Sequence, residues 1–391
     1  MGRLGCSLLV LLTGCAAPKA TPVAASALEP PRPSSPASLV SSSGGASGSA
    51  AVQALRARLG GDSVTLTLEP ALQESAERAV HDAGKAAAAV VISPETGDVL
   101  ALASVPGERG DPLLVAHAPA STFKPFVALA ALEAGVLAAG SQRTCSGKFN
   151  VDGVTLSCFG VHGKEDVRKA IAASCNSFFY QVGMELDFAR LAQGVRRFGY
   201  GERTGIELED EAGFVPEAAE VTGRARAVEA IGHGKARITL LQLARAYAAL
   251  ANGGKLLRLG LVRSRRGTDG ALHSVERPPA TTIELAPSAL ETVRRGLLDA
   301  VSEEYGMAHP IARADLAFAA KTGSADAAPL PGAKPDAEPD TDRWLVAYAP
   351  ASAPKIVIAV RVERGAEPPL SVVRSVLDVW KDTPQQRATQ R

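Results

Sequence analysis

Ser121 and Lys124, three residues apart in the string Ser-Thr-Phe-Lys, could form a nucleophile and its base. If a helix begins at Ser121, residues three apart lie on one face, so the lysine amine can reach the serine hydroxyl. A partly desolvated lysine has a lowered pKa and can accept the serine proton. The free N–H groups of a helix N-terminus can also stabilise an oxyanion. Alone this pattern is weak, and we interpret its second occurrence, Ser352 to Lys355, as accidental because it lies in a Pro-containing turn.

A second pattern is Ser174-Cys175-Asn176, the only S-x-N in the chain. Alternate residues can present a hydroxyl and a carboxamide to the same site. The hydroxyl of Ser174 could relay a proton to a leaving amine, and the amide of Asn176 could orient a substrate carbonyl. An isolated S-x-N is, however, more often a helix cap or a turn.

A third pattern, Lys321-Thr322-Gly323-Ser324, lies at the end of a predicted strand and is the only K-[ST]-G of the chain. Lys321 supplies positive charge, Thr322 can bind a carboxylate, and Gly323 lets a substrate backbone approach closely. The alternative is a strand end that passes into a turn.

The three motifs occur in the order S-x-x-K, S-x-N, K-[ST]-G, and this set resembles the penicillin-binding protein and serine β-lactamase superfamily. The stretches ISPETGDVLALAS, SCNSFFYQVG, IGHGKARITLLQLARAYAALANGG and RWLVAYAP are also similar to parts of penicillin-binding transpeptidase domains. The resemblance covers about residues 63–381.

The resemblance implies that Ser121 attacks the penultimate D-alanine carbonyl of a peptidoglycan stem peptide and forms an acyl-enzyme, with Lys124 as base. Ser174 would relay the proton to the leaving group. The backbone N–H groups of Ser121 and Ser324 would form the oxyanion hole. A β-lactam would acylate the same serine.

Substrate binding is implied for the remaining motif residues. Asn176 would orient the acyl chain, and Lys321, Thr322 and Ser324, with Gly323 between them, would hold the terminal carboxylate. The resemblance implies no cofactor, and a separate glycosyltransferase is an expected partner.

Three activities stay open within this resemblance. A D,D-transpeptidase is favoured over a D,D-carboxypeptidase or a β-lactamase, because the E-x-x-x-N element of class A β-lactamases is missing. Class D enzymes, in addition, usually carry a hydrophobic residue where Asn176 stands. A β-lactam or muropeptide sensor that never turns over is a further alternative, although the signalling helices of such sensors are absent.

The helices and strands expected around these motifs, which must position them, indicate a mixed α/β (α+β) fold. An antiparallel sheet would be formed by N- and C-terminal strands, flanked by helices, with a mostly helical subdomain inserted at about 115–300. A helix is expected within 69–84, a hairpin around Pro-Glu-Thr-Gly-Asp, and an amphipathic helix that ends at Gly253-Gly254. The expected C-terminal elements are strands at 316–321, 344–349 and 355–362 and a helix at 370–381.

The N-terminal residues predict export. Residues 1–14 combine Arg3, an apolar run and a small-residue cleavage site, and Cys15 follows as in the lipobox of bacterial lipoproteins. We expect Cys15 to be lipidated, so that the protein is anchored on the periplasmic or extracytoplasmic side of a bacterial membrane. An ordinary secretory signal is the alternative. Residues 15–62, rich in Ala, Ser and Pro, would be a flexible tether or a cleaved pro-segment, 63–385 the transpeptidase domain and 386–391 a tail.

The composition excludes some classes of protein function. The 391 residues are 46% hydrophobic, enough for a sizeable core, and the net charge of +1 gives no support for nucleic-acid binding.

In an exported domain Cys145 and Cys158 could form a disulfide or remain free thiols, and Cys175 is expected to be a buried structural thiol. We expect His162 and His233 to have structural or substrate-edge roles, no metal site, and a loop at 325–343.

Overall fold

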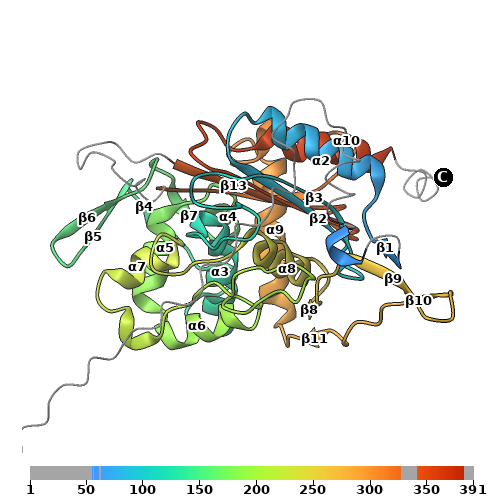
Figure 1. Ribbon diagram of the computed structural model, residues 1–391. Coiled ribbons are helices and arrows are strands. Elements are labelled where there is room, and N and C mark those ends of the chain that lie inside the picture. The colour runs from blue at the N-terminus through green and yellow to red at the C-terminus, as the bar shows by residue number, and fades with distance from the viewer. Residues whose placement is uncertain (1–54, 56, 61–62, 327–340, 383–391) are drawn as a thin grey trace, which may run out of the picture. The chain divides into compact units, whose positions relative to one another are not determined.

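The computed structural model describes residues 55, 57–60, 63–326 and 341–382, and its centre is a five-stranded antiparallel sheet (Figure 1). The strand order is β12-β13-β14-β2-β3. The strands are β2 (Ala87–Ile92), β3 (Val99–Val105), β12 (Ala319–Asp326), β13 (Thr341–Ala349) and β14 (Ile356–Val362). The N-terminal hairpin joins the C-terminal strands through β2 and β14, with Val90 opposite Ala359. The predicted fold class is confirmed.

Every residue of β2 and β14 is buried, because helices cover both faces of the sheet. Helices α2 (Pro70–Asp82) and α10 (Leu370–Lys381) pack on one face, where Val91 and Ile358 point, while α8 (Leu240–Ala251) packs on the other face. Continuous apolar runs such as Ile-Val-Ile-Ala-Val are therefore required, in place of the alternating pattern of a half-exposed strand.

The inserted region holds most of the helices and several small ladders. The remaining helical elements are η2 (Ala120–Phe123), α3 (Lys124–Glu133), α4 (Val167–Ala172), α5 (Asn176–Glu185), α6 (Phe188–Arg196), η3 (Ala218–Glu220), α7 (Ala225–Ala230), α9 (Pro287–Ser302) and η4 (His309–Ile311). The remaining strands are β1 (Val64–Leu66), β4 (Arg143–Cys145), β5 (Lys148–Val151), β6 (Val154–Ser157), β7 (Gly163–Glu165), β8 (Lys255–Leu256), β9 (Val262–Arg266), β10 (Leu272–Ser274) and β11 (Thr281–Thr282). The sequence did not predict these strands, because each is only two to five residues long, and several, such as β5, β6 and β10, are largely exposed.

The expected helices at 69–84 and 370–381 and the hairpin before the first motif are confirmed. The strand expected at 316–321 is displaced, since β12 is Ala319–Asp326 and contains the whole third motif. Its polar residues gave no strand signal, but ladder pairing to β13 from Ala319 to Asp326 makes them extended. Of the expected loop at 325–343, the described ends belong to β12 and β13, and 327–340 lie outside the described residues.

The N-terminal predictions, including Cys15 and nearly all of the tether, lie outside the described residues, and so does the tail at 386–391. The boundaries of the domain at 63 and 385 therefore stay predictions. Within the part of the chain that the structure describes, no helix has the length and apolar character needed to cross a membrane.

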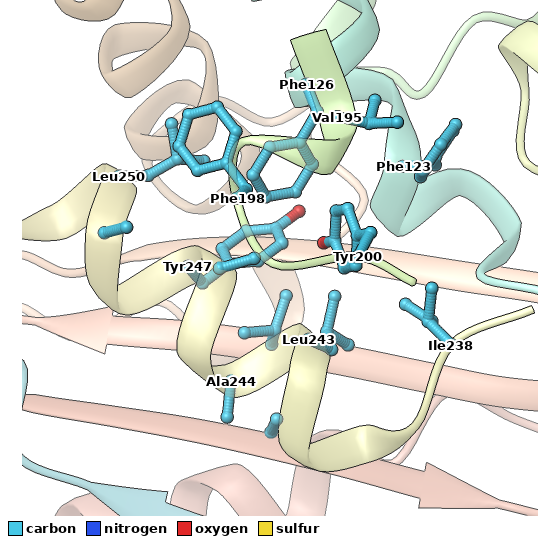
Figure 2. Packing of buried hydrophobic residues seen from close by; sticks show 14 of the residues in the cluster. Phe123, Phe126, Val195, Phe198, Tyr200, Ile238, Leu243, Ala244, Tyr247 and Leu250 are labelled. Atoms are coloured by element: carbon cyan, nitrogen blue, oxygen red, sulfur yellow. The ribbon is translucent and has the colours of Figure 1, made fainter. Parts of the chain in front are cut away.

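An aromatic cluster joins α3 to α8 (Figure 2). The ring of Phe126 meets those of Phe198, Tyr200 and Tyr247 edge-on, with centroids 4.9, 5.1 and 5.3 Å away. The Tyr247 hydroxyl donates a hydrogen bond to the Thr122 carbonyl at 2.9 Å. The cluster thus fixes the segment that carries Ser121 to a helix that packs on the sheet.

We predict that Phe126→Ala lowers the free energy of unfolding by about 3–5 kcal/mol, because it leaves a cavity among these rings. Denaturant unfolding measures the loss. The matched control is Phe214→Ala, whose side chain is 42% exposed and should cost much less. Equal losses for the two variants would contradict the assigned role of the cluster.

Candidate active site

Ser121 lies in η2, which continues directly into α3 at Lys124. The preceding residue, Ala120, has φ 53°, a conformation that costs a non-glycine residue energy and persists only where the surroundings enforce it. Its N–H donates to the Gly232 carbonyl at 3.0 Å. A Cβ at Gly232 would lie 2.1 Å from the Ala120 carbonyl oxygen, so only glycine permits this contact. The helical turn considered at Ser121 is present, begins one residue earlier at Ala120 and is of the 3-10 type.

The Lys124 side chain is fully buried, and its amine lies against the second motif. Its Nζ donates to the Ser174 carbonyl and to Asn176 Oδ1, both at 2.6 Å, and lies 3.3 Å from Ser174 Oγ. The amine also lies 5.6 Å from the centre of the Phe179 ring. The structure therefore brings the first two motifs together, and the lysine is held by the partners that the second motif supplies.

Ser174 occupies a strained turn immediately before α5, with φ 54°. Its hydroxyl accepts a hydrogen bond from Lys321 Nζ at 2.8 Å, so Ser174 Oγ lies between two lysine amines. A helix cap, the ordinary explanation of the motif, is also present: Cys175 is the N-cap of α5, and its Sγ accepts from the Phe178 N–H. The cap and the polar site therefore use different residues of one turn.

The third motif lies within β12 beside the first. Lys321 is 1% exposed and Thr322 4%. A Cβ on Gly323 would lie 3.0 Å from Thr122 Cγ2 and 3.2 Å from Ala120 Cβ, so the glycine allows the strand to approach η2 closely. This contact within the protein was not expected from the sequence.

Burial sets the electrostatics of the site. Desolvation lowers the pKa of Lys124 to about 7, although the thiols of Cys175 and Cys158 and the carboxyl of Glu165 oppose this shift. Desolvation also lowers the pKa of Lys321, and the charge of Lys124 adds to the effect. A buried amine with a lowered pKa can lose its proton near neutral pH, as a general base requires.

Two residues flank Ser324 at the site, and sequence reasoning missed one of them, Arg343, whereas it expected a structural or substrate-edge role for His233. Arg343 on β13 donates to Ser324 Oγ at 2.8 Å, and the two residues are paired in the ladder. His233 hydrogen-bonds the Ser324 backbone, and burial lowers its pKa to about 4, so the ring is neutral at physiological pH. Only strand pairing or tertiary contact reveals these neighbours, because each lies far along the chain from its partner.

The sequence left two alternatives for Cys145 and Cys158, a disulfide between them or two free thiols. Cys145, Cys158 and Cys175 are all free thiols in the structure, so the disulfide between Cys145 and Cys158 is not formed. Cys175 is fully buried, as expected of a structural thiol.

Comparisons with known proteins agree with the arrangement of the three motifs. Residues 87–376 match the family described as the penicillin binding protein transpeptidase domain. The chain belongs to this family.

Among its relatives is peptidoglycan D,D-transpeptidase MrdA of Escherichia coli, 29% identical over 81% of this chain and 57% of that protein. The chain thus spans little more than half of that relative. Peptidoglycan D,D-transpeptidase PbpA of Mycolicibacterium smegmatis is 27% identical over 78% of this chain and 68% of that protein.

Solved structures show the same fold. The D,D-transpeptidase domain of a peptidoglycan glycosyltransferase from Eggerthella lenta superimposes with a TM-score of 0.74 at 26% identity, covering 82% of this chain and 83% of the other. PBP2 of Pseudomonas aeruginosa, solved in complex with WCK 5153, gives a TM-score of 0.71 at 27% identity and covers 83% and 79% of the two chains.

Proposed function

We propose that this protein is a peptidoglycan D,D-transpeptidase that acts through a serine acyl-enzyme on stem peptides ending in D-Ala-D-Ala. The observation that carries the proposal is the convergence of Lys124 and Lys321 on Ser174, beside the helical turn that begins at Ser121. Membership of the transpeptidase family and the D,D-transpeptidase relatives support the same reaction.

In the acylation step, Ser121 Oγ attacks the carbonyl of the penultimate D-alanine while the amine of Lys124 takes the hydroxyl proton. Backbone N–H groups of Ser121 and Ser324 stabilise the oxyanion. When the tetrahedral intermediate collapses, the peptide C–N bond breaks and the leaving amine of D-alanine receives a proton through Ser174. The hydrogen bonds of Ser174 Oγ with both lysines suit this relay.

In the second step an acceptor amine from another stem peptide attacks the acyl-enzyme, forms the cross-link and releases Ser121, to which a proton returns. Asn176 orients the acyl chain. Lys321, Thr322 and Ser324 hold the terminal carboxylate, and Arg343 fixes the Ser324 hydroxyl. A β-lactam acylates Ser121 in the same way as the stem peptide, and its opened ring stays attached to the serine.

We predict that Ser121→Ala abolishes covalent labelling by a fluorescent penicillin, since no other hydroxyl occupies the nucleophile position. Gel fluorescence after incubation measures the labelling. The matched control is Ser352→Ala, in the second S-x-x-K of the chain, which should label like the wild type. Labelling of Ser121→Ala would mean that another serine is the nucleophile, and an unlabelled wild type would remove the main support for the acyl-enzyme.

Product analysis separates the remaining activities. With a stem pentapeptide and an acceptor amine, we predict a cross-linked product and free D-alanine, together with slow release of penicilloate from the penicillin adduct. Mass spectrometry measures both. A tetrapeptide without cross-links would identify a carboxypeptidase, and rapid penicillin turnover a β-lactamase. Acylation without any turnover would identify a sensor.

We propose further that the protein is exported and held on the extracytoplasmic side of a bacterial membrane by lipid on Cys15. A separate glycosyltransferase would then supply the glycan strands that it cross-links. A structural neighbour at 26% identity with a TM-score of 0.72 comes from work described as structural coordination of polymerization and crosslinking by a peptidoglycan synthase complex. This structural similarity supports a glycosyltransferase as the kind of partner.

Cys15→Ser is predicted to prevent metabolic labelling with a palmitate analogue and to move the protein from the membrane fraction to the soluble fraction, because two acyl chains give stable anchoring. The control is Cys6→Ser, within the segment expected to be removed. Unchanged palmitate labelling and membrane association of Cys15→Ser would refute the anchor.

A further inference from the structure

Glu229 is a buried carboxylate that none of the catalytic steps above uses. It lies one residue before the end of α7 and is only 1% exposed. Its Oε2 accepts a hydrogen bond from the Lys235 N–H at 2.7 Å, and its Oε1 accepts one from the Ala236 N–H at 3.0 Å. Both side-chain oxygens therefore bind the backbone of residues 231–236, the α7 loop, which follows the helix.

The burial of this carboxylate has a cost that the core does not require. Desolvation raises the pKa of Glu229, whereas its two backbone N–H partners and the charges of Arg237 and Lys235 oppose the rise. An apolar side chain at this position would avoid the cost of removing a charge from water. The backbone groups that the carboxylate binds are therefore the reason for a charged residue here.

The α7 loop is wrapped tightly around Glu229. The Gly232 N–H donates to the Glu229 carbonyl at 2.9 Å, and Gly232 has φ 74°, a left-handed conformation that suits glycine. A Cβ on Gly234 would overlap Glu229 Oε2, so the chain passes directly over the carboxylate there. Together with the two side-chain hydrogen bonds, these contacts fix the path of the α7 loop.

The α7 loop reaches the first and third motifs. The Gly232 carbonyl accepts a hydrogen bond from the Ala120 N–H at 3.0 Å, one residue before the nucleophile. His233 hydrogen-bonds the Ser324 backbone. Since the N–H groups of Ser121 and Ser324 form the proposed oxyanion hole, the loop contacts the chain on both of its sides.

Helix α7 is itself fixed to the helix that begins within the second motif. It packs against α5, and a Cβ on Gly183 of α5 would lie 2.6 Å both from Ala230 Cβ and from the Arg226 carbonyl oxygen. Arg226 Nη2 also donates to the Leu186 carbonyl at 2.6 Å, at the end of α5. Glu229 therefore joins a helix anchored on the second motif to a loop that contacts the other two motifs.

We propose that Glu229 is a positioning residue for acylation, which holds the α7 loop so that the N–H groups of Ser121 and Ser324 face the same substrate oxygen. The proposal rests on the transpeptidase function proposed above. Glu229 touches no substrate and exchanges no proton in this role, and it acts only through the loop. Geometry matters here because a misplacement of about 1 Å can reduce a rate about 100-fold.

Replacing the carboxylate by an amide of the same shape tests this role. Glu229→Gln keeps one acceptor oxygen but places an NH2 donor against the other backbone N–H, so the α7 loop must move. We expect the rate constant for acylation by a fluorescent penicillin to fall about 10–100-fold, while the constant for the preceding noncovalent binding changes much less. Labelling time courses at several penicillin concentrations separate the two constants.

The matched control is Glu207→Gln. The Glu207 carboxylate also accepts from two consecutive backbone N–H groups, those of Leu261 at 2.7 Å and Val262 at 3.2 Å. These residues lead into β9, which pairs with β1. Glu207→Gln is therefore expected to lose stability and to keep the wild-type acylation rate constant.

Hydrogen exchange measures the α7 loop directly and needs no activity. In the wild type the amides of Lys235, Ala236 and Ala120 should be protected, since each donates a hydrogen bond within the protein. In Glu229→Gln, exchange should rise at all three amides, including that of Ala120, which the carboxylate does not touch. In Glu207→Gln, exchange at these amides should stay at the wild-type rate.

Several results would overturn the proposal. They are an unchanged acylation rate constant in Glu229→Gln, slowing of the same size in Glu207→Gln, and fast exchange of the wild-type amides at 235 and 236. If Glu229→Gln does not fold, the wild-type exchange measurement still holds, and Glu229→Asp, which keeps the charge on a shorter side chain, should show intermediate slowing. Failure of the proposed transpeptidase function would instead appear as an unlabelled wild type whose amides exchange as expected.

Discussion

Two buried lysine amines share the hydroxyl of Ser174, and the site is arranged around that constraint. An ammonium group removed from water needs acceptors, and Lys124 finds them on the carbonyl of Ser174 and the amide of Asn176. Lys321 finds one on the Ser174 hydroxyl. Burial lowers the pKa values of both amines, and the charge of Lys124 lowers that of Lys321 further. Burial therefore makes the amines able to exchange protons, while these contacts hold them in place.

Bringing these lysines together requires the sheet and the inserted region to meet closely. Lys321 is held by β12 in the sheet, whereas Lys124 begins α3 in the insertion. The contact between them is tight at Gly323, which lies against the turn of Ala120 and Thr122. The aromatic cluster around Phe126 and the hydrogen bond from Tyr247 then keep that turn in place. The position of the Ser121 turn therefore depends on packing some distance from it.

The turn of Ser174 is restrained from two sides. The lysine amines contact its polar side, and the free thiols of Cys145, Cys158 and Cys175 lie behind it, with Cys175 as the shared residue. A positive φ at Ser174 is unfavourable for a side chain and persists only under such restraint.

The sequence by itself determined the fold class, the main-sheet strands other than β12, the terminal helices and the identity of the three motifs. Those signals are local: apolar runs, helical spacing and short strings of reactive residues. Only the tertiary structure decided that the third motif lies inside a strand and that Arg343 and His233 flank Ser324. It also decided that the loop after α7 contacts both Ala120 and Ser324. These facts depend on ladder pairing and on contacts between distant segments, and a pattern along one chain does not encode which segments will meet.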